Sequence, residues 1–260
     1  MSDIIDDLAA EHAALDAMVA DLDEDAWRTP TPAEGWSILD TLGHLNFYDE
    51  RALVALTDPP AFQAHVADVV AHGLPVGHDT DHARALGGPA LLPKWRAERD
   101  AMISAMRAFD PSERALWYGP AMSLNSFVTA RLMETWAHGV DVSDALGLPV
   151  VVSERLRNVC HISIGARAYS FFARGVEDPG DPIRCELVSP AGETWTWGPA
   201  EAADVVRGPA LDLALLVTQR RHLDDTALDV TGDTAALWLS IAQSFAGPSG
   251  GGRQPLAASR

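Results

Sequence analysis

The sequence predicts an α+β protein, in which an N-terminal four-helix bundle is followed by a small α/β domain. The first half carries apolar residues at helical spacing in long segments that are separated by stretches rich in Pro, Gly and Asp. The second half combines helical segments with short runs that alternate apolar and polar residues, as half-buried strands do. Since 47% of the 260 residues are hydrophobic, the chain has enough apolar material for a core in each half.

The helices expected in the first half span residues 3–25, 37–57, 84–108 and 121–146, with a shorter helix near 61–73. Ser37 and Asp40 have the spacing of a capping box, which predicts that the second helix starts at Ser37. Gly147 and Pro149 are typical of the residues that follow a helix end. We therefore expect a helical domain over residues 1–150, with the domain boundary at its end.

The second domain is expected over residues 151–247. Its predicted elements are a helix near 153–174, a hairpin of residues 184–188 and 193–197 around a Pro-Ala-Gly turn, a helix near 208–222, a strand at 228–230 and a last helix near 233–246. Residues 248–260 are rich in Gly, Ser and Pro and show no periodicity, which predicts a disordered tail.

Charge and cysteine content exclude several classes of protein. The chain has 37 acidic and 19 basic residues, a formal charge of −18, which disfavours binding to nucleic acid or to an anionic membrane. Cys160 and Cys185 are the only cysteines and lack the spacing of a disulfide scaffold or a thiolate zinc site. The N-terminus does not resemble a signal peptide, and no apolar run reaches 18 residues. We expect a cytoplasmic protein that acts on a small molecule.

The clearest chemical pattern is Glu134 and His138, which lie four residues apart on the fourth long helix. Their side chains project from one helix face and can converge on one cation. Small residues such as Ala130 and Ala145 flank this face and leave room for a ligand. A solvated helix face is the alternative interpretation of the same spacing. His44, on the second helix, is by itself typical of a half-buried helix histidine.

The motif Trp-Ser-x-x-Asp-x-x-x-His that ends at His44, followed about ninety residues later by Glu-x-x-x-His, resembles the DinB-like superfamily. It is most similar to the actinobacterial branch that includes mycothiol-dependent maleylpyruvate isomerase. That branch also has an aspartate three residues after the second histidine, which here is Asp141. The resemblance covers residues 1–150 well and the rest more loosely. It implies a DinB-like bundle followed by a sterol-carrier-like α/β domain, to which residues 215–221 and 230–233 are similar.

The resemblance implies that a divalent metal is bound by His44, Glu134 and His138. Three protein ligands leave open coordination positions, as a catalytic metal requires. Imidazole and carboxylate ligands make zinc the first choice, with nickel, iron and manganese as the other candidates. We assign Tyr48 and Asp141 as candidate catalytic residues, which would orient an imidazole or a bound nucleophile.

The resemblance also implies a low-molecular-weight thiol such as mycothiol as cofactor, and an isomerase or transferase activity. A thiolate would add to an activated cis double bond, and its expulsion after rotation would give the trans product. Arg220 is the nearest match to the family's substrate-binding arginine, and its guanidinium would pair a substrate carboxylate. Thr218-Gln219 replaces the family's usual Trp-Gly before this arginine, so Arg221 remains the alternative.

Two other functions remain open on the same residues. Metal-activated water would make the protein a hydrolase or a cyclase, and a non-catalytic module would bind metal or a small apolar ligand. The cluster from His78 to His82 is interpreted as a solvated loop or a lid. The sequence contains no G-x-S-x-G motif, so nothing in it indicates a serine hydrolase. Cys160 is interpreted as a buried inert thiol.

Overall fold

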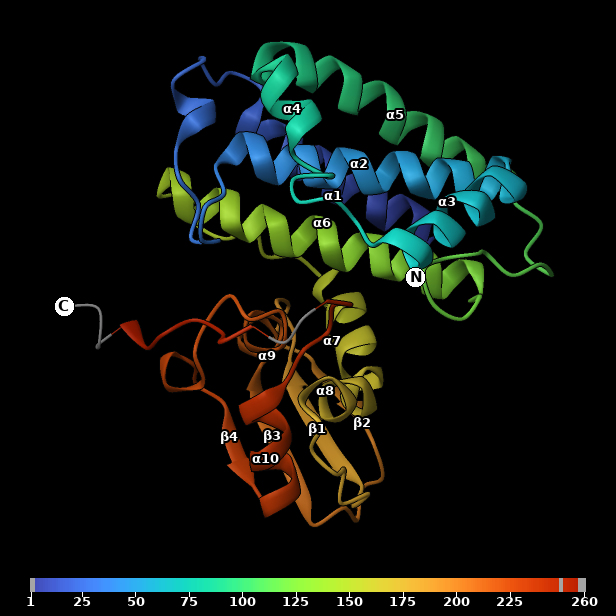
Figure 1. Cartoon of the computed structure of the whole chain (residues 1–260). Helices are drawn as coiled ribbons and strands as arrows, with labels where there is room; N and C mark the ends of the chain where they lie inside the picture. Colours follow the sequence, from blue (N-terminus) through green and yellow to red (C-terminus); the bar gives the residue numbers. More distant parts are fainter. Residues whose placement is uncertain (1–2, 248–249, 257–260) are drawn as a thin grey trace. The chain divides into compact units, whose positions relative to one another are not determined.

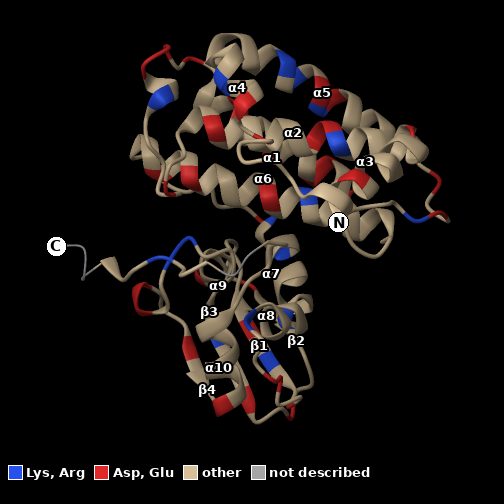
Figure 2. Cartoon of the chain, in the orientation of Figure 1, with Lys and Arg blue, Asp and Glu red and all other residues tan. Residues whose placement is uncertain are grey.

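The computed structural model describes residues 3–247 and 250–256 and divides the chain into two compact units, Met1–Val151 and Val152–Arg260 (Figure 1). We call these the N-terminal unit and the C-terminal unit. The helices and the small sheet together confirm the expected α+β class. Acidic residues are spread over both units (Figure 2), in keeping with the charge of −18. Within the described ranges, no helix combines the length and the apolar character that crossing a membrane requires.

The N-terminal unit is a helical bundle (Figure 1). Its long helices are α1 (Ile4–Val19), α2 (Ile38–Thr57), α5 (Gly88–Ala108) and α6 (Leu124–Leu146), and its short ones are the 3-10 helix η1 (Ala26–Arg28), α3 (Pro59–His72) and α4 (Asp81–Leu86). Helix α1 packs on α5 and α6, and α2 packs on α4, α5 and α6. The two helices that carry the candidate metal ligands, α2 and α6, are therefore direct neighbours.

The ends of α2 and α6 follow from local sequence. Ser37 Oγ accepts a hydrogen bond from the Asp40 N–H (3.3 Å), and Asp40 Oδ2 accepts one from the Ser37 N–H (2.9 Å), which confirms the predicted capping box. Helix α6 begins after Ser123, whose hydroxyl accepts from the Ser126 N–H (3.2 Å). It ends at Leu146, and the next residue, Gly147, adopts the left-handed conformation with φ 64°.

Two of the predicted helix boundaries in this unit are wrong. The helix predicted over 84–108 is interrupted at Gly87, whose φ of 75° separates α4 from α5. Gly88 lies so close to the indole of Trp27 that a Cβ at this position would be 2.2 Å from Trp27 Cγ. The helix predicted over 3–25 ends at Val19. The chain turns after it, where Asp23 Oδ1 accepts the Ala26 N–H (2.8 Å).

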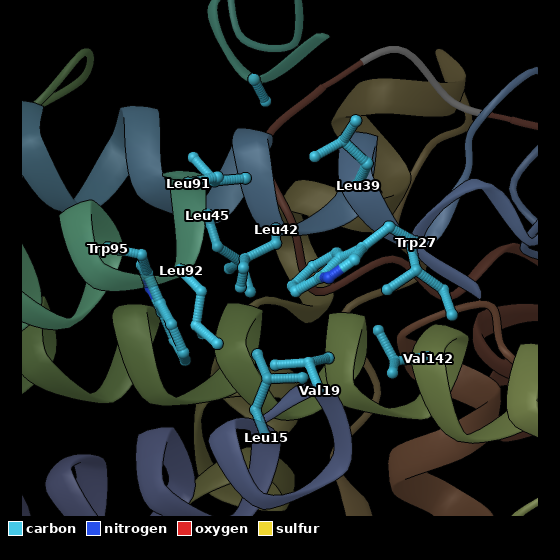
Figure 3. Packing of buried hydrophobic residues seen from close by; sticks show 12 residues of the cluster. Leu15, Val19, Trp27, Leu39, Leu42, Leu45, Leu91, Leu92, Trp95 and Val142 are labelled. Atoms are coloured by element: carbon cyan, nitrogen blue, oxygen red, sulfur yellow. The ribbon is translucent and has the colours of Figure 1, made fainter. Parts of the chain in front are cut away.

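A cluster of buried apolar side chains joins the long helices of the N-terminal unit (Figure 3). It includes Leu15, Val19, Trp27, Leu39, Leu42, Leu45, Leu91, Leu92, Trp95 and Val142. Trp27 and Trp95 are 1% and 0% exposed, so both rings contribute most of their apolar area to this core. The cluster draws on α1, η1, α2, α5 and α6 and so fixes how these helices pack.

A buried ion pair crosses the same bundle. Asp49 of α2 accepts hydrogen bonds from Arg131 Nη2 of α6 (2.7 Å) and from Trp95 Nε1 of α5 (3.1 Å). The His12 imidazole lies 3.6 Å from this carboxylate, and burial lowers the pKa of His12 to about 4, which leaves the ring neutral near pH 7. Arg131 is therefore the positive charge that balances Asp49, and the pair ties α6 to α2.

The C-terminal unit is built on a sheet with the strand order β2-β1-β3-β4. Its strands are β1 (Ile183–Val188), β2 (Thr194–Trp197), β3 (Asp204–Pro209) and β4 (Asp229–Thr231), and its helices are α7 (Leu156–Gly165), α8 (Arg167–Arg174), α9 (Ala210–Val217), the 3-10 helix η2 (Leu223–Asp225) and α10 (Asp233–Ile241). The antiparallel pairing of β1 with β2 confirms the predicted hairpin. Strand β3 runs parallel to β1, and α9 and α10 pack on it.

The sequence prediction missed β3. Residues 204–209 form a strand that pairs with β1, and the helix predicted from 208 begins at Ala210. The helix predicted over 153–174 is divided at Ala166 (φ −82°, ψ 6°), directly after Gly165, a residue with weak helix preference. Helix α10 ends at Ile241, five residues before the predicted end at 246.

Part of the predicted tail makes contacts within the C-terminal unit. Arg174 Nη2 donates to the Gly250 carbonyl (2.7 Å), and the Leu256 N–H donates to the Asp225 carboxylate (3.0 Å). The rest of the predicted tail, residues 248, 249 and 257–260, lies outside the described residues.

Candidate metal centre

The structure brings together the three side chains that the sequence analysis assigns to a metal. His44, Glu134 and His138 each offer a donor atom, and these atoms all lie within 4.8 Å of one another. His44 comes from α2, whereas Glu134 and His138 lie one turn apart on α6. The imidazole rings of His44 and His138 have centroids 4.7 Å apart, and His138 Nε2 is 3.6 Å from Glu134 Oε2. This spacing suits donors that share one cation, and metal binding itself stays a prediction.

Each of the two histidines has a carboxylate beside its Nδ1 atom. His44 Nδ1 lies 2.8 Å from Asp79 Oδ2, and His138 Nδ1 lies 3.3 Å from Asp141 Oδ2. An ionised carboxylate can only accept, so Nδ1 of His44 carries the proton in its hydrogen bond with Asp79. Nε2 is then the nitrogen of His44 that remains for a metal. Asp141 was assigned to such an orienting role from the sequence, and its role stays a prediction.

The electrostatics of Glu134 and His44 are compatible with a cation. Burial raises the pKa of Glu134, but its hydrogen bond with His138 and the charges of the two imidazoles and Arg131 outweigh this effect and hold it at about 2. Burial lowers the pKa of His44, in spite of the opposing effect of Asp79. Near pH 7 the centre therefore offers an ionised carboxylate and a neutral imidazole, which are the forms that bind metal.

Aromatic rings enclose the centre. The Trp36 ring stacks on His138, with centroids 6.0 Å apart and planes at 18°, and it lies 5.1 Å from His44. The Tyr48 ring lies 4.8 Å from His44, and Trp117 packs against Tyr48 with ring centroids 6.3 Å apart. Aromatic surface therefore lies beside both ligand imidazoles, while Glu134 keeps 24% of its side chain exposed.

Tyr48 is a proton donor rather than a base at neutral pH. Burial raises the pKa of Tyr48 to about 12, and Asp79 and Glu134 add to this shift. Its hydroxyl lies 3.3 Å from His78 Nε2. The catalytic role that the sequence analysis assigns to Tyr48 stays a prediction.

The segment from His78 to His82 is only partly solvated, which corrects the interpretation as a solvated loop, and the alternative interpretation as a lid stays a prediction. Asp79 and Thr80 are buried, at 9% and 3% exposure, and Asp79 contacts His44. The two histidines of the segment have different partners. His78 contacts Tyr48, and His82 Nε2 lies 3.2 Å from Asn46 Oδ1. Sequence reasoning thus missed Asp79. The dense grouping of acidic and imidazole side chains was the only signal that could have revealed it.

Arg220 and Arg221 belong to the C-terminal unit. Arg220 Nη1 donates to the Thr218 carbonyl (2.6 Å), and Arg221 Nη1 donates to the Arg220 carbonyl (2.7 Å). Arg221 lines a cavity of about 120 Å³, together with Arg174, Gln219, His222, Arg253 and neighbouring residues. Gln219 has a φ of 61°, a conformation that costs a non-glycine residue energy.

Cys160 is the buried thiol that the sequence analysis expects. Cys160 and Cys185 are free and buried, and burial raises the pKa of both thiols, which makes them poor nucleophiles. Trp195 and Trp238 are 5% and 1% exposed and contribute to the core of the C-terminal unit.

Comparisons with known proteins identify the family. The model of the mycothiol maleylpyruvate isomerase N-terminal domain matches residues 8–143, more than half of the chain. Two Mycobacterium tuberculosis proteins, Rv0036c of strain ATCC 25618 / H37Rv and MT0041 of strain CDC 1551 / Oshkosh, are each 44% identical over 250 residues. The alignments cover 95% of this chain and 96% of each relative, and both relatives are named as uncharacterized proteins.

Solved structures have the same fold. The crystal structure of the mycothiol-dependent maleylpyruvate isomerase matches with a TM-score of 0.57 and 17% identity, over 89% of this chain and 92% of that one. A mutant form of that enzyme matches with a TM-score of 0.56 and 16% identity, over 87% and 91%. The chain belongs to the mycothiol maleylpyruvate isomerase N-terminal domain family.

Proposed function

We propose that this protein is a metal-dependent enzyme that uses a low-molecular-weight thiol, such as mycothiol, to isomerise a small electrophilic carboxylic acid or to transfer the thiol onto it. The observation that carries this proposal is the convergence of two imidazoles and one carboxylate from α2 and α6. Membership of the family supports the thiol and the isomerisation, because the matching structures are of a mycothiol-dependent maleylpyruvate isomerase.

The donor set fits a divalent cation. His44, Glu134 and His138 would hold it, with zinc as the first choice and nickel, iron or manganese as the other candidates. A cation with this ligand set lowers the pKa of a thiol that it binds, which makes the thiolate available near neutral pH. The ionised Glu134 and the neutral His44 are already in the forms that bind metal.

The surrounding side chains support a thiol as the nucleophile. Trp36 and Tyr48 place aromatic surface beside the ligand imidazoles, where it can pack against the carbon atoms next to a thiol group. The Tyr48 hydroxyl keeps its proton at neutral pH and can donate a hydrogen bond to charge that develops on a substrate oxygen. Asp141 would hold His138 while the nucleophile is exchanged.

Thiol dependence is the experiment that tests this function. Metal-loaded protein would be incubated with maleylpyruvate and mycothiol, and conversion to the trans isomer would be followed by NMR. We expect turnover that requires the thiol and that is absent in the His44→Ala variant. Hydrolysis or another conversion of a small-molecule panel without thiol would overturn the proposal in favour of water as the nucleophile.

Arg220 of the C-terminal unit is the proposed partner of the substrate carboxylate, with Arg221 as the alternative. We expect Arg220→Ala to raise KM for a carboxylate substrate by roughly 10- to 150-fold, since a hydrogen bond to a charged group contributes about 1.5–3 kcal/mol. Arg221→Ala tests the alternative assignment, and Arg207→Ala is the control because Arg207 pairs with Glu186 on the exposed sheet face. Metal content should not change in any of the three variants. A KM effect confined to Arg221→Ala would move the role to Arg221, and an unchanged KM in both variants would discard the role.

A further inference from the structure

The segment between α3 and α4 contacts the side chains of α2 at two points. His78 Nε2 lies 3.3 Å from the Tyr48 hydroxyl, and Asp79 Oδ2 lies 2.8 Å from His44 Nδ1. A third contact comes from the first turn of α4, where His82 Nε2 lies 3.2 Å from Asn46 Oδ1. The carboxylate of Asp79 is the member of this set that reaches a candidate metal ligand, from a position 35 residues away in the sequence.

Backbone features hold Asp79 in this position. The Thr80 and Asp81 N–H groups both donate to the Gly77 carbonyl, at 3.0 and 2.8 Å, which closes a tight turn around Asp79. Gly77 has a φ of 77°, which favours glycine. On α2, a Cβ at Gly43 would lie 2.5 Å from Ala83 Cβ of α4 and 3.5 Å from the Asp79 carbonyl oxygen, so glycine beside His44 allows α4 and the segment before it to approach this closely.

We propose that Asp79 is a positioning residue of the metal centre: its carboxylate holds the Nδ1–H of His44 and so directs Nε2 toward the metal shared with Glu134 and His138. This inference rests on the proposed metal site. A histidine that binds a metal through one nitrogen commonly donates its other N–H to a carboxylate, which fixes the tautomer and the ring orientation. Asp79 supplies such a partner with a short contact and little exposure to water.

The carboxylates beside the two ligand histidines come from different parts of the fold. Asp141 lies three residues from His138 on the same helix, so its contact comes with the formation of α6. Asp79 reaches His44 only when the segment after α3 has packed on α2. The affinity of the metal should therefore depend on this packing, and the loss of Asp79 should affect the metal more than the fold.

Metal affinity of Asp79 variants tests the inference. Zinc dissociation constants of the full-length protein would be measured by competition with a chromogenic chelator, for the wild type, Asp79→Ala, Asp79→Asn and the control Asp81→Asn. Asp81 is two residues away, is 68% exposed in its side chain and pairs with Arg84. We expect Asp79→Ala to weaken zinc binding by about 10- to 100-fold, the range found for outer partners of metal ligands. The zinc affinity of Asp79→Asn should lie between those of Asp79→Ala and the wild type, because the amide oxygen of the new side chain still accepts from the Nδ1–H of His44. The zinc affinity of Asp81→Asn should match that of the wild type.

Thermal unfolding of the metal-free proteins separates positioning from folding. We expect the midpoints of wild type and Asp79→Asn to agree while their zinc affinities differ. If Asp79→Ala fails to fold, the zinc affinity of Asp79→Asn relative to the wild type tests the inference. Equal zinc affinity of wild type, Asp79→Asn and any folded Asp79→Ala would overturn the inference about Asp79 and leave the metal site intact. Absence of zinc binding by the wild type would instead overturn the proposed function, so the two failures can be told apart.

Discussion

Glu134→Ala is expected to abolish stoichiometric metal binding, and His44→Ala and His138→Ala are expected to do the same. Each substitution leaves two donors, and two donors from a set of three do not retain a divalent cation against water. We expect affinity to fall by more than about 100-fold, beyond the 10- to 100-fold effect of an outer partner. Metal content after purification without chelator, measured by mass spectrometry, gives the result directly.

A histidine outside the centre provides the control. His72 is exposed at the end of α3 and pairs with Asp68, so His72→Ala removes an imidazole without touching α2 or α6. Its metal content should equal that of the wild type. Full metal retention by the Glu134 and His44 variants would show that these residues are not ligands.

Asp49→Ala is expected to destabilise the N-terminal unit by about 3–5 kcal/mol, the usual cost of removing one partner of a buried ion pair. The substitution leaves the Arg131 guanidinium buried without its carboxylate and the Trp95 Nε1–H without its acceptor. The neutral His12 cannot replace the lost negative charge. Hydrogen exchange of peptides from α2 and α6 reports the free energy of opening for this unit alone.

The matched control for Asp49→Ala is an exposed ion pair of the same unit. Asp6→Ala removes the partner of Arg107, where the two side chains are 57% and 48% exposed. Exposed pairs contribute about 0–1 kcal/mol, so exchange protection should hardly change in this variant. An equally small effect of Asp49→Ala would mean that the buried pair does not tie α6 to α2.

Local signals account for what the sequence predicted well. The capping box at Ser37 and the glycine at position 147 fix helix ends through contacts within a few residues, so they can be recognised without tertiary information. Glu134 and His138 share a helix face for the same reason. Adding His44 to this pair depends on how α2 packs on α6, and the sequence indicated it only through the resemblance to a family.

Contacts between distant segments account for what was missed. Asp79 lies 35 residues from His44, and their meeting depends on the tight turn at Gly77 and on the missing side chain of Gly43. Strand β3 is stabilised by parallel pairing with β1, which no local pattern specifies. In both cases the decisive partner is set by the fold, so periodicity and spacing could not reveal it.

X-ray absorption spectroscopy of the metal in the purified protein, before and after addition of mycothiol, tests the central claim most directly. We expect about one equivalent of a single transition metal with nitrogen and oxygen ligands that include two imidazoles, and the appearance of one sulfur ligand at about 2.3 Å once the thiol is added. Metal bound without imidazole ligands, or a ligand shell that stays free of sulfur at saturating thiol, would contradict the account.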